Sequence, residues 1–240
     1  MYAFESVARP VLFEQEDADF PYWGKGSSFL LANSNHYYWI TANHVITKMG
    51  GTADMLRIFP ADGSRISLPF NESYLINHEG LDDEDYKDIY ALRIDLSEFE
   101  ENGDAPLTAQ DIEEGMLSAE KLTLNDELWI IGYPSESNFI DFDSCSIKNT
   151  RSVIRATYQG DSLSQHCHTA KIETTINLSS YDGLSGSPVF FLKSIMKGEQ
   201  QIQLPLFVGM LLRGTKESSL VHFVSSSVIG RLIQLAETDA

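Results

Sequence analysis

The stretch DGLSGSPVF, from Asp182 to Phe190, places a serine between two glycines and then enters an apolar segment. Glycine on both sides of a polar residue marks a tight turn, but a turn alone does not require a serine at its centre. We therefore take Ser185 as a candidate nucleophile. A serine hydroxyl is a weak nucleophile at neutral pH, so it needs a base within hydrogen-bond reach and a third group that orients the base.

The candidate base is His44, one of six histidines in the chain. In YWITANHVI (38–46) it is the only histidine predicted to lie where a strand ends and a turn begins, which places its ring at the rim of a sheet. Taken alone, a histidine that ends a strand and caps a turn is the simpler interpretation. The case for a base depends on the partners that the rest of the chain supplies.

The orienting carboxylate is sought in DDEDYKDIYALRI (82–94). Asp82, Asp83 and Asp85 stand among other acidic residues and are expected to form a solvated face. Asp88 directly precedes the strand IYALRI, where the chain enters the core, and we favour it as the partner of His44. The alternative is that Asp88 only caps the start of the strand.

The same acidic region includes NHEGLDDED (77–85), which we considered as a metal site. It lacks the glycine-containing spacing of a calcium loop and offers no tetrahedral ligand set. We therefore expect a solvated loop there, with no metal and no cofactor.

Short apolar runs rich in β-branched and aromatic residues recur along the chain, separated by Gly, Asn, Asp and Ser, which is typical of an antiparallel barrel or sandwich. The runs are SSFLLA (27–32), HYYWITA (36–42), MLRIFP (55–60), DIYALRI (88–94), ELWIIGYP (127–134), AKIETTI (170–176), PVFFL (188–192), LFVGMLL (206–212) and LVHFVS (220–225). Helical spacing appears at the C-terminus in VIGRLIQLAE (228–237), with a cap at Ser225, Ser226 or Ser227, and a shorter helix is possible at TAQDIEEGM (108–116). The polar stretch 100–121 breaks the rhythm, so we divide the chain into units at 1–105 and 106–240.

The formal net charge of −18 and the pI near 4.5 disfavour binding to nucleic acid, because the chain repels phosphate. The longest apolar run, LPLFVGMLL (204–212), is too short to cross a bilayer, and the first residues do not have the pattern of a signal peptide. We therefore expect a cytoplasmic protein that does not bind membranes. Cys145 and Cys167 match no metal-ligand spacing; they form a disulfide or, in a reducing compartment, stay free thiols.

Six segments occur in an order that resembles the chymotrypsin-like serine peptidases, most closely the bacterial branch that includes the HtrA and glutamyl-endopeptidase types. The segments are GKGSSFLL (24–31), ITANHVI (40–46), KDIYALRI (87–94), DELWIIGYP (126–134), GLSGSPVF (183–190) and FVGMLLRG (207–214). The order His, Asp, Ser is the one that this fold uses. The resemblance implies an all-β fold of two packed antiparallel barrels with a C-terminal helix and the active site in the cleft between them.

Roles follow from the resemblance residue by residue. His44 would be the general base, Asp88 would hold its tautomer, and Ser185 would attack the scissile carbonyl. The N–H groups of Gly183 and Ser185 would form the oxyanion hole. The substrate-binding residues would be Ser179, Leu212, Arg213, Gly214 and His222.

The sequence also departs from the family pattern. Val45 stands where secreted animal members have a cysteine, and Leu184 stands where zymogen members have an aspartate that pairs with a newly cut N-terminus. Ser187 replaces the second glycine of the usual motif, which bears on the geometry of the loop. No PDZ-like segment follows, so trimeric quality-control behaviour is not implied.

Two functions from different classes remain. The first is an active serine endopeptidase that takes a protein or peptide substrate. The second is a binding module on the same fold, either silent or gated by a regulatory protein partner. The presence of all three of His44, Asp88 and Ser185 favours the first, because decay of an enzyme usually removes at least one member of its triad.

Overall fold

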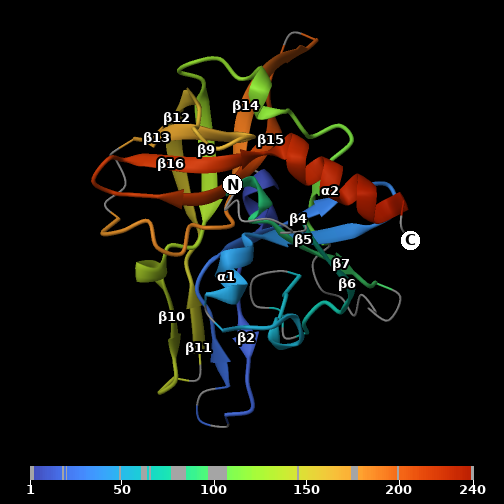
Figure 1. Ribbon diagram of the computed structural model, residues 1–240, viewed down its shortest axis with the longest axis vertical. Coiled ribbons are helices and arrows are strands. Elements are labelled where there is room, and N and C mark those ends of the chain that lie inside the picture. Colours follow the sequence, from blue (N-terminus) through green and yellow to red (C-terminus); the bar gives the residue numbers. More distant parts are fainter. Residues whose placement is uncertain are drawn as a thin grey trace.

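The computed structural model describes residues 3–17, 19, 21–48, 50–60, 64, 66–76, 85–96, 107–144, 146–173, 178–198 and 200–238. Antiparallel strands dominate both halves of the chain, and a helix follows the last strand (Figure 1). The expected β-rich architecture with a C-terminal helix is confirmed. None of the helices in the described ranges is long and apolar enough to cross a membrane.

The N-terminal half is built on a sheet with the strand order β1-β4-β5-β7-β6, and the short strand β8 pairs with β4. The strands are β1 (Ala8–Pro10), β4 (Ser27–Ala32), β5 (Tyr37–Thr41), β6 (Phe70–Leu75), β7 (Tyr90–Ile94) and β8 (Gln110–Asp111). Both faces of β4 are buried, as the continuous apolar run SSFLLA requires. The helix α1 (Asn43–Thr47) follows β5 directly.

Two isolated β-bridges lie between the edge strands β1 and β6 of this sheet. Phe13, just beyond β1, pairs with Leu56, and Ile58 pairs with Leu68, just before β6. These bridges use two residues of MLRIFP, so that run does belong to the sheet system, although only as isolated pairings. They make the N-terminal half barrel-like without a continuous closing strand among the described residues.

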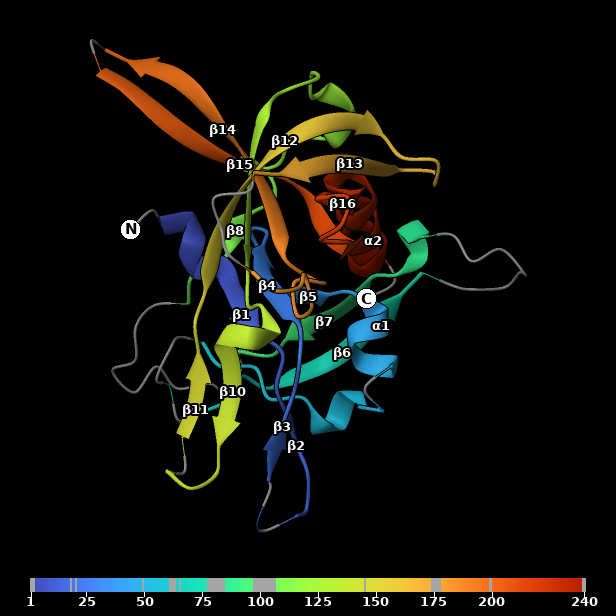
Figure 2. The same ribbon diagram turned by 90° about the vertical axis from the view of Figure 1, so that its left-hand side faces the viewer.

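The C-terminal half is a closed barrel with the strand order β12-β13-β16-β15-β14-β9. The strands are β9 (Glu127–Gly132), β12 (Ser152–Asp161), β13 (Cys167–Ile172), β14 (Pro188–Lys197), β15 (Gln200–Gly214) and β16 (Leu220–Ser225). Pro188 begins β14, where its missing N–H is tolerated. The far ends of β14 and β15 extend beyond the barrel as a projecting hairpin (Figure 2).

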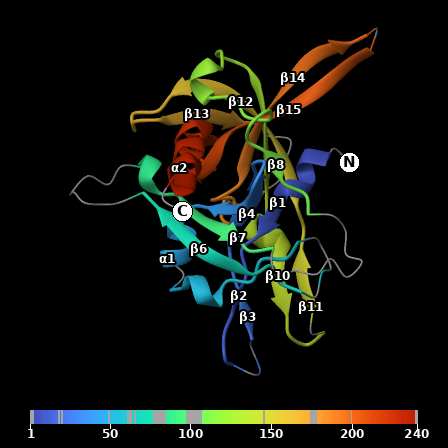
Figure 3. The same ribbon diagram turned by 90° about the vertical axis from the view of Figure 1, so that its right-hand side faces the viewer.

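Two short hairpins extend from the opposite end of the molecule, away from the β14–β15 projection (Figures 1 and 3). One pairs β2 (Phe13–Glu14) with β3 (Tyr22–Trp23), and the other pairs β10 (Asn138–Asp141) with β11 (Ser146–Asn149). The first belongs to the N-terminal half and the second to the C-terminal half, yet they lie at the same end.

The helix α2 (Ser226–Thr238) returns from the last strand to the N-terminal half. The Ser225 hydroxyl accepts the N–H of Ser227 at 3.4 Å, which agrees with the expected serine cap. At the other end of the helix, Glu237 accepts hydrogen bonds from Tyr38 and from Asn33 Nδ2 (3.0 Å), and contacts His36 Nδ1 at 2.8 Å. The last turn of α2 is thereby fixed to β5 and the turn that precedes it.

Glu237 should make the stability of the protein dependent on acid. Burial alone raises the pKa of this carboxyl, but the hydrogen bonds from Tyr38, Asn33 and His36 outweigh it and bring the pKa to about 2. A lowered folded-state pKa stabilises the protein above the unfolded-state pKa, and this stabilisation is lost as pH falls toward 2. We expect Glu237→Gln to lose about 2 kcal/mol of unfolding free energy at pH 7. In urea unfolding, the loss caused by Glu237→Gln should be smaller at pH 2.5 than at pH 7. An equal loss at both pH values would contradict this role of Glu237.

The shorter helix considered possible at 108–116 does not form. In TAQDIEEGM, Gln110 and Asp111 pair in parallel with Leu31 and Ala32 of β4, and the chain then turns. Pairing with a distant strand outweighs the weak local helical preference here. The proposed boundary between 105 and 106 lies outside the described residues, so the division into 1–105 and 106–240 stays a prediction.

Candidate active site

The candidate base and its carboxylate come from neighbouring elements of the N-terminal half. His44 is in the first turn of α1, and Asp88 lies two residues before β7, which is paired with β5. Asp88 Oδ1 accepts the backbone N–H of His44 at 2.8 Å, and Asp88 Oδ2 lies 2.5 Å from His44 Nδ1. Both side chains are one-quarter exposed. The two contacts fix the ring so that Nε2 is left for a reaction partner.

The loop around Ser185 is held between the two halves. Ser27, at the start of β4, donates its N–H to the Ser185 carbonyl (2.9 Å) and its hydroxyl to the Gly183 carbonyl (2.7 Å). On the other side, Gly186 donates its N–H to the Leu211 carbonyl of β15 at 2.8 Å. GKGSSFLL resembles the corresponding family segment, but nothing in its residues indicates that Ser27 braces the loop around Ser185.

Both glycines beside Ser185 are required by the backbone. Gly183 has φ +86° and Gly186 has φ +87°, in the left-handed region that favours glycine. A Cβ on Gly186 would lie 1.9 Å from the Ser27 carbonyl oxygen, and a Cβ on Gly183 would lie 2.5 Å from the Tyr133 carbonyl oxygen. The two glycines therefore allow the tight loop that presents Ser185.

The same loop orients two N–H groups suited to an anion. The Asp182 carbonyl accepts the Ser135 N–H at 2.8 Å, and a trans peptide directs its C=O and N–H in opposite directions. The Gly183 N–H consequently faces away from Ser135. Within the described part of the chain, neither the Gly183 N–H nor the Ser185 N–H donates to another protein group. Unused donors on a fixed backbone are what an oxyanion hole requires.

The Ser185 hydroxyl itself donates to the Leu212 carbonyl at 2.8 Å. The register between β15 and β16 shifts from Leu211 to Arg213, so Leu212 is a bulge residue. Among the contacts of the described residues, Ser185 Oγ makes no hydrogen bond to His44. A rotation about χ1 to another staggered rotamer is needed to redirect the hydroxyl.

A cleft of about 680 Å³ brings these groups together. Among the residues expected in the site, the cleft is lined by His44, Asp88, Gly183, Ser185, Leu212, Arg213 and Gly214. The charged residues Lys25, Lys48, Asp85 and Asp182 also line it. Residues more than a hundred positions apart therefore share one concave surface, which is the usual setting of an enzyme site.

Asp85 corrects one expectation from the sequence. It is not part of a purely solvated face: its Oδ2 accepts Arg213 Nη2 at 2.5 Å and the Ser164 hydroxyl at 2.8 Å, and its side chain is 23% exposed. The ion pair joins the segment before β7 to β15, across the cleft. A second ion pair, Lys25 with Asp182 at 3.3 Å, crosses between the halves elsewhere on the same cleft. Asp82 and Asp83 lie outside the described residues.

Two residues expected to bind substrate point elsewhere. Ser179 donates both its N–H (2.8 Å) and its hydroxyl to Glu136. His222 lies 3.1 Å from the Ser162 hydroxyl, and burial, assisted by the charge of Arg213, lowers its pKa. Neither is among the described residues that line the cleft.

Cys167 is a buried free thiol at the start of β13. Burial raises its pKa to about 12, with a further contribution from Asp85, so it is protonated at neutral pH and unreactive. Cys145 lies outside the described residues, as do residues 77–84, which include most of the segment considered for a metal.

Comparison with known proteins finds similarity in structure but not in sequence. No family model matches the sequence, and no curated protein matches it. A thermostable serine protease, AL20, from an extremophilic microorganism has a TM-score of 0.55 and 15% identity, with both chains fully covered. A scabies mite inactivated protease paralogue, S-I1, has a TM-score of 0.58 and 14% identity over 99% of this chain and 96% of its own.

Identities this low establish shared architecture rather than shared activity. Both solved structures belong to the two-barrel class that the order of His44, Asp88 and Ser185 led us to expect. Together with the closed C-terminal barrel and the terminal helix, they show that the chain has the fold of the chymotrypsin-like serine proteases.

Proposed function

We propose that the protein is a serine endopeptidase. His44 Nε2 takes the proton of Ser185 as Ser185 Oγ attacks the scissile carbonyl carbon, while Asp88 stabilises the resulting imidazolium. The N–H groups of Gly183 and Ser185 stabilise the oxyanion. His44 then returns the proton to the departing amine, which leaves an acyl-enzyme. Water, deprotonated by His44, hydrolyses the acyl-enzyme and restores Ser185.

The observation that carries this proposal is the double contact between Asp88 and His44. One carboxylate oxygen holds the backbone of the base and the other holds Nδ1, so the ring cannot turn without losing a short contact. A strand-start cap, the alternative for Asp88, would not require the histidine ring. The N–H groups of Gly183 and Ser185, which donate to no group among the described residues, supply the rest of the machinery in the same cleft.

A specific observation favours the second candidate, a silent or partner-gated binding module. The Ser185 hydroxyl is engaged with Leu212 rather than with His44. Hydrogen bonds of catalytic groups in unliganded enzymes are often poorly aligned and improve only with substrate bound, so this geometry does not exclude the peptidase. A regulatory protein partner that shifts the Leu212 bulge would be a direct way to gate the nucleophile.

Covalent labelling separates the two functions. A fluorophosphonate probe should label the wild type at Ser185, with peptide mapping to confirm the site, and should not label Ser185→Ala. Labelling of the wild type only after addition of a cell extract would favour the gated module. Absence of labelling under both conditions would contradict the peptidase.

The specificity that we expect is for an uncharged side chain of medium size before the cut. The carboxylates lining the cleft are already paired: Asp85 with Arg213, Asp88 with His44, and Asp182 with Lys25. Among the described residues of the cleft, a Lys or Arg of the substrate would therefore find no free carboxylate, and an unpaired buried charge is costly.

A peptide library varied at the residue before the cut tests this specificity. Preference for Arg or Lys would contradict our assignment of the pocket. Preference for Glu or Gln that disappears in His222→Ala would favour the alternative in which His222 contacts the substrate.

The finer classification stays part of the proposal. We place the protein with the bacterial HtrA and glutamyl-endopeptidase types, acting on proteins or peptides in the cytoplasm. The order of the six sequence segments supports this branch, and the charge of −18 supports a chain that does not bind nucleic acid. We propose no membrane partner, because the sequence offers no apolar run of spanning length.

A further inference from the structure

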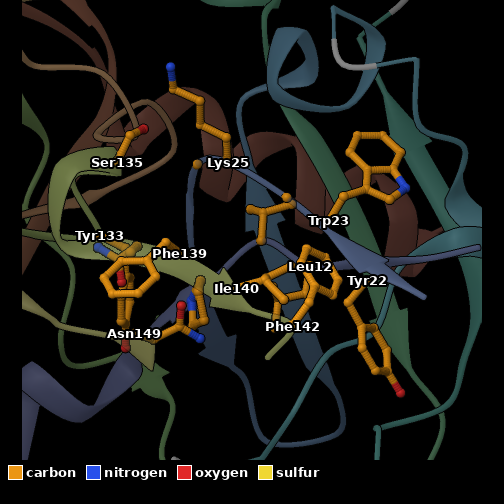
Figure 4. Close-up of a pocket in the computed structure, with 15 residues that line it drawn as sticks. Leu12, Tyr22, Trp23, Lys25, Tyr133, Ser135, Phe139, Ile140, Phe142 and Asn149 are labelled. Carbon is orange, nitrogen blue, oxygen red and sulfur yellow. The ribbon is translucent and has the colours of Figure 1, made fainter. Parts of the chain in front are cut away.

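A second hollow adjoins the cleft and has a different character. It has a volume of about 290 Å³ and lies between the β2–β3 and β10–β11 hairpins (Figure 4). Trp23 and Leu12 line it from the N-terminal half, and Phe139, Ile140 and Phe142 line it from the C-terminal half. Its size, at the low end of the range for ligand pockets, suits one or two side chains. We call it the hairpin groove.

The hairpin groove is adjacent to the cleft. Lys25 and Gly26 line both, and Figure 4 shows Lys25 and Ser135 together at one end of the groove. Ser135 donates its N–H to the Asp182 carbonyl, whose peptide carries the Gly183 N–H of the candidate oxyanion hole. The wall of the groove is therefore one hydrogen bond away from the site at which the scissile carbonyl would bind.

Two apolar side chains of the groove are substantially exposed. Phe139 is 53% exposed and Phe142 is 37% exposed, although both stand on a short polar hairpin. Trp23 stacks on Phe13 with ring centroids 4.4 Å apart, which fixes one wall. Contiguous exposed apolar surface beside an active site is typical of a binding region.

The position of the groove selects which part of a substrate reaches it. Leu212–Gly214 and Lys25–Gly26 both line the cleft. Leu212 accepts the Ser185 hydroxyl, and Ser27, which follows Gly26, donates its N–H to the Ser185 carbonyl. In the proposed enzyme the residues before the cut pair with the exposed strand end at Leu212–Gly214. The chain after the cut then leaves past Gly183 and Lys25, toward the hairpin groove.

We propose that the hairpin groove binds an apolar, preferably aromatic, side chain located one or two residues after the scissile bond. This inference rests on the proposed peptidase function and names the substrate class of the same site. Trp23, Phe142 and Phe139 provide the apolar contact, and Ile140 also lines the groove (Figure 4).

The test compares peptides that differ only after the cut. With the preceding residues fixed, Phe at the second position after the cut should raise kcat/KM about tenfold over Ala, the range expected for filling one apolar pocket. In the double variant Phe139→Ala/Phe142→Ala this ratio should fall to within about twofold. Met196→Ala, which removes an exposed apolar side chain on the remote β14–β15 hairpin, should leave the ratio unchanged. A ratio near one in the wild type, or a ratio unaffected by the double variant, would overturn the inference.

A binding measurement tests the groove proposal independently of the peptidase proposal. In a Ser185→Ala background, fluorescence anisotropy should give a dissociation constant about tenfold lower for the Phe peptide than for the Ala peptide. This difference should disappear when Phe139 and Phe142 are also replaced. If the difference is present but the wild type hydrolyses nothing, the groove stands and the peptidase proposal fails. If the two peptides bind with equal affinity and the wild type hydrolyses them normally, the peptidase proposal stands and the groove proposal fails.

Discussion

Replacing either Ser185 or His44 by alanine is expected to lower kcat by at least about a thousandfold, and the double variant should be no slower than the slower single variant. Ser185 supplies the attacking oxygen and His44 takes its proton, so each group is useless without the other. The remaining rate would come from substrate binding and from the N–H groups of Gly183 and Ser185, which alanine leaves in place.

The fold should survive both substitutions. His44 is one-quarter exposed, and Ser185 makes a single side-chain hydrogen bond among the described contacts. Ser187→Ala is the matched control, because Ser187 lies in the same loop, is fully buried, and has a hydroxyl without a partner in the described part of the chain. Removing such a hydroxyl should not destabilise the protein. Steady-state hydrolysis of a peptide ester and thermal unfolding should be measured on all variants; a double variant far slower than both singles would show that the two residues act independently.

The strands that the sequence predicted well are those with a continuous or alternating apolar pattern. SSFLLA became β4 over the same six residues, and LVHFVS became β16, because burial of such runs leaves few alternative arrangements. The two hairpins that form the groove were not foreseen. β10 (NFID) and β11 (SIKN) mix Asn, Asp, Ser and Lys with a few apolar residues, so neither the two-residue period of a strand nor the 3.6-residue period of a helix is visible in their sequence.

Chain order and local position were enough to select the three central side chains. His44 was chosen because it follows a strand, and Asp88 because it precedes one; pairing of β5 with β7 then brings these two ends together. Ser185 was chosen from its glycines, whose positive φ values supply the physical reason.

Contacts between the two halves could not be predicted from the sequence. Asp85 pairs with Arg213 across 128 positions, and the acidic neighbours of Asp85 suggested solvent instead. The same limit applies to Ser27, whose two hydrogen bonds to the nucleophile loop depend on how the halves dock. Ser179 is a different case: the resemblance places it at the substrate pocket, while its hydroxyl donates to Glu136, so its contact with substrate stays a prediction.

Asp88 and Asp85 offer a matched pair of substitutions in one short segment, and Asp88→Asn should have the larger effect. We expect kcat to fall by about four orders of magnitude, which is the loss typical of an Asp-to-Asn change in a Ser-His-Asp triad. Asp88 accepts two hydrogen bonds from His44, one from the backbone N–H and one from the ring. Asparagine has one carbonyl oxygen, so its amide N–H₂ must face one of these donors. His44 avoids this donor–donor contact by carrying its proton on Nε2. The Nε2 lone pair that should accept the proton of Ser185 is then lost.

Asp85→Asn is the control of equal size and equal charge change. It keeps an acceptor for Ser164 but loses the charge opposite Arg213, whose side chain is 59% exposed. Exposed ion pairs contribute little, so we expect less than a tenfold change in kcat/KM. Rates for both variants on one peptide substrate, with circular dichroism to confirm the fold, decide the assignment. Full activity in Asp88→Asn together with a large loss in Asp85→Asn would transfer the orienting role to Asp85, the only other described carboxylate of this segment that lines the cleft.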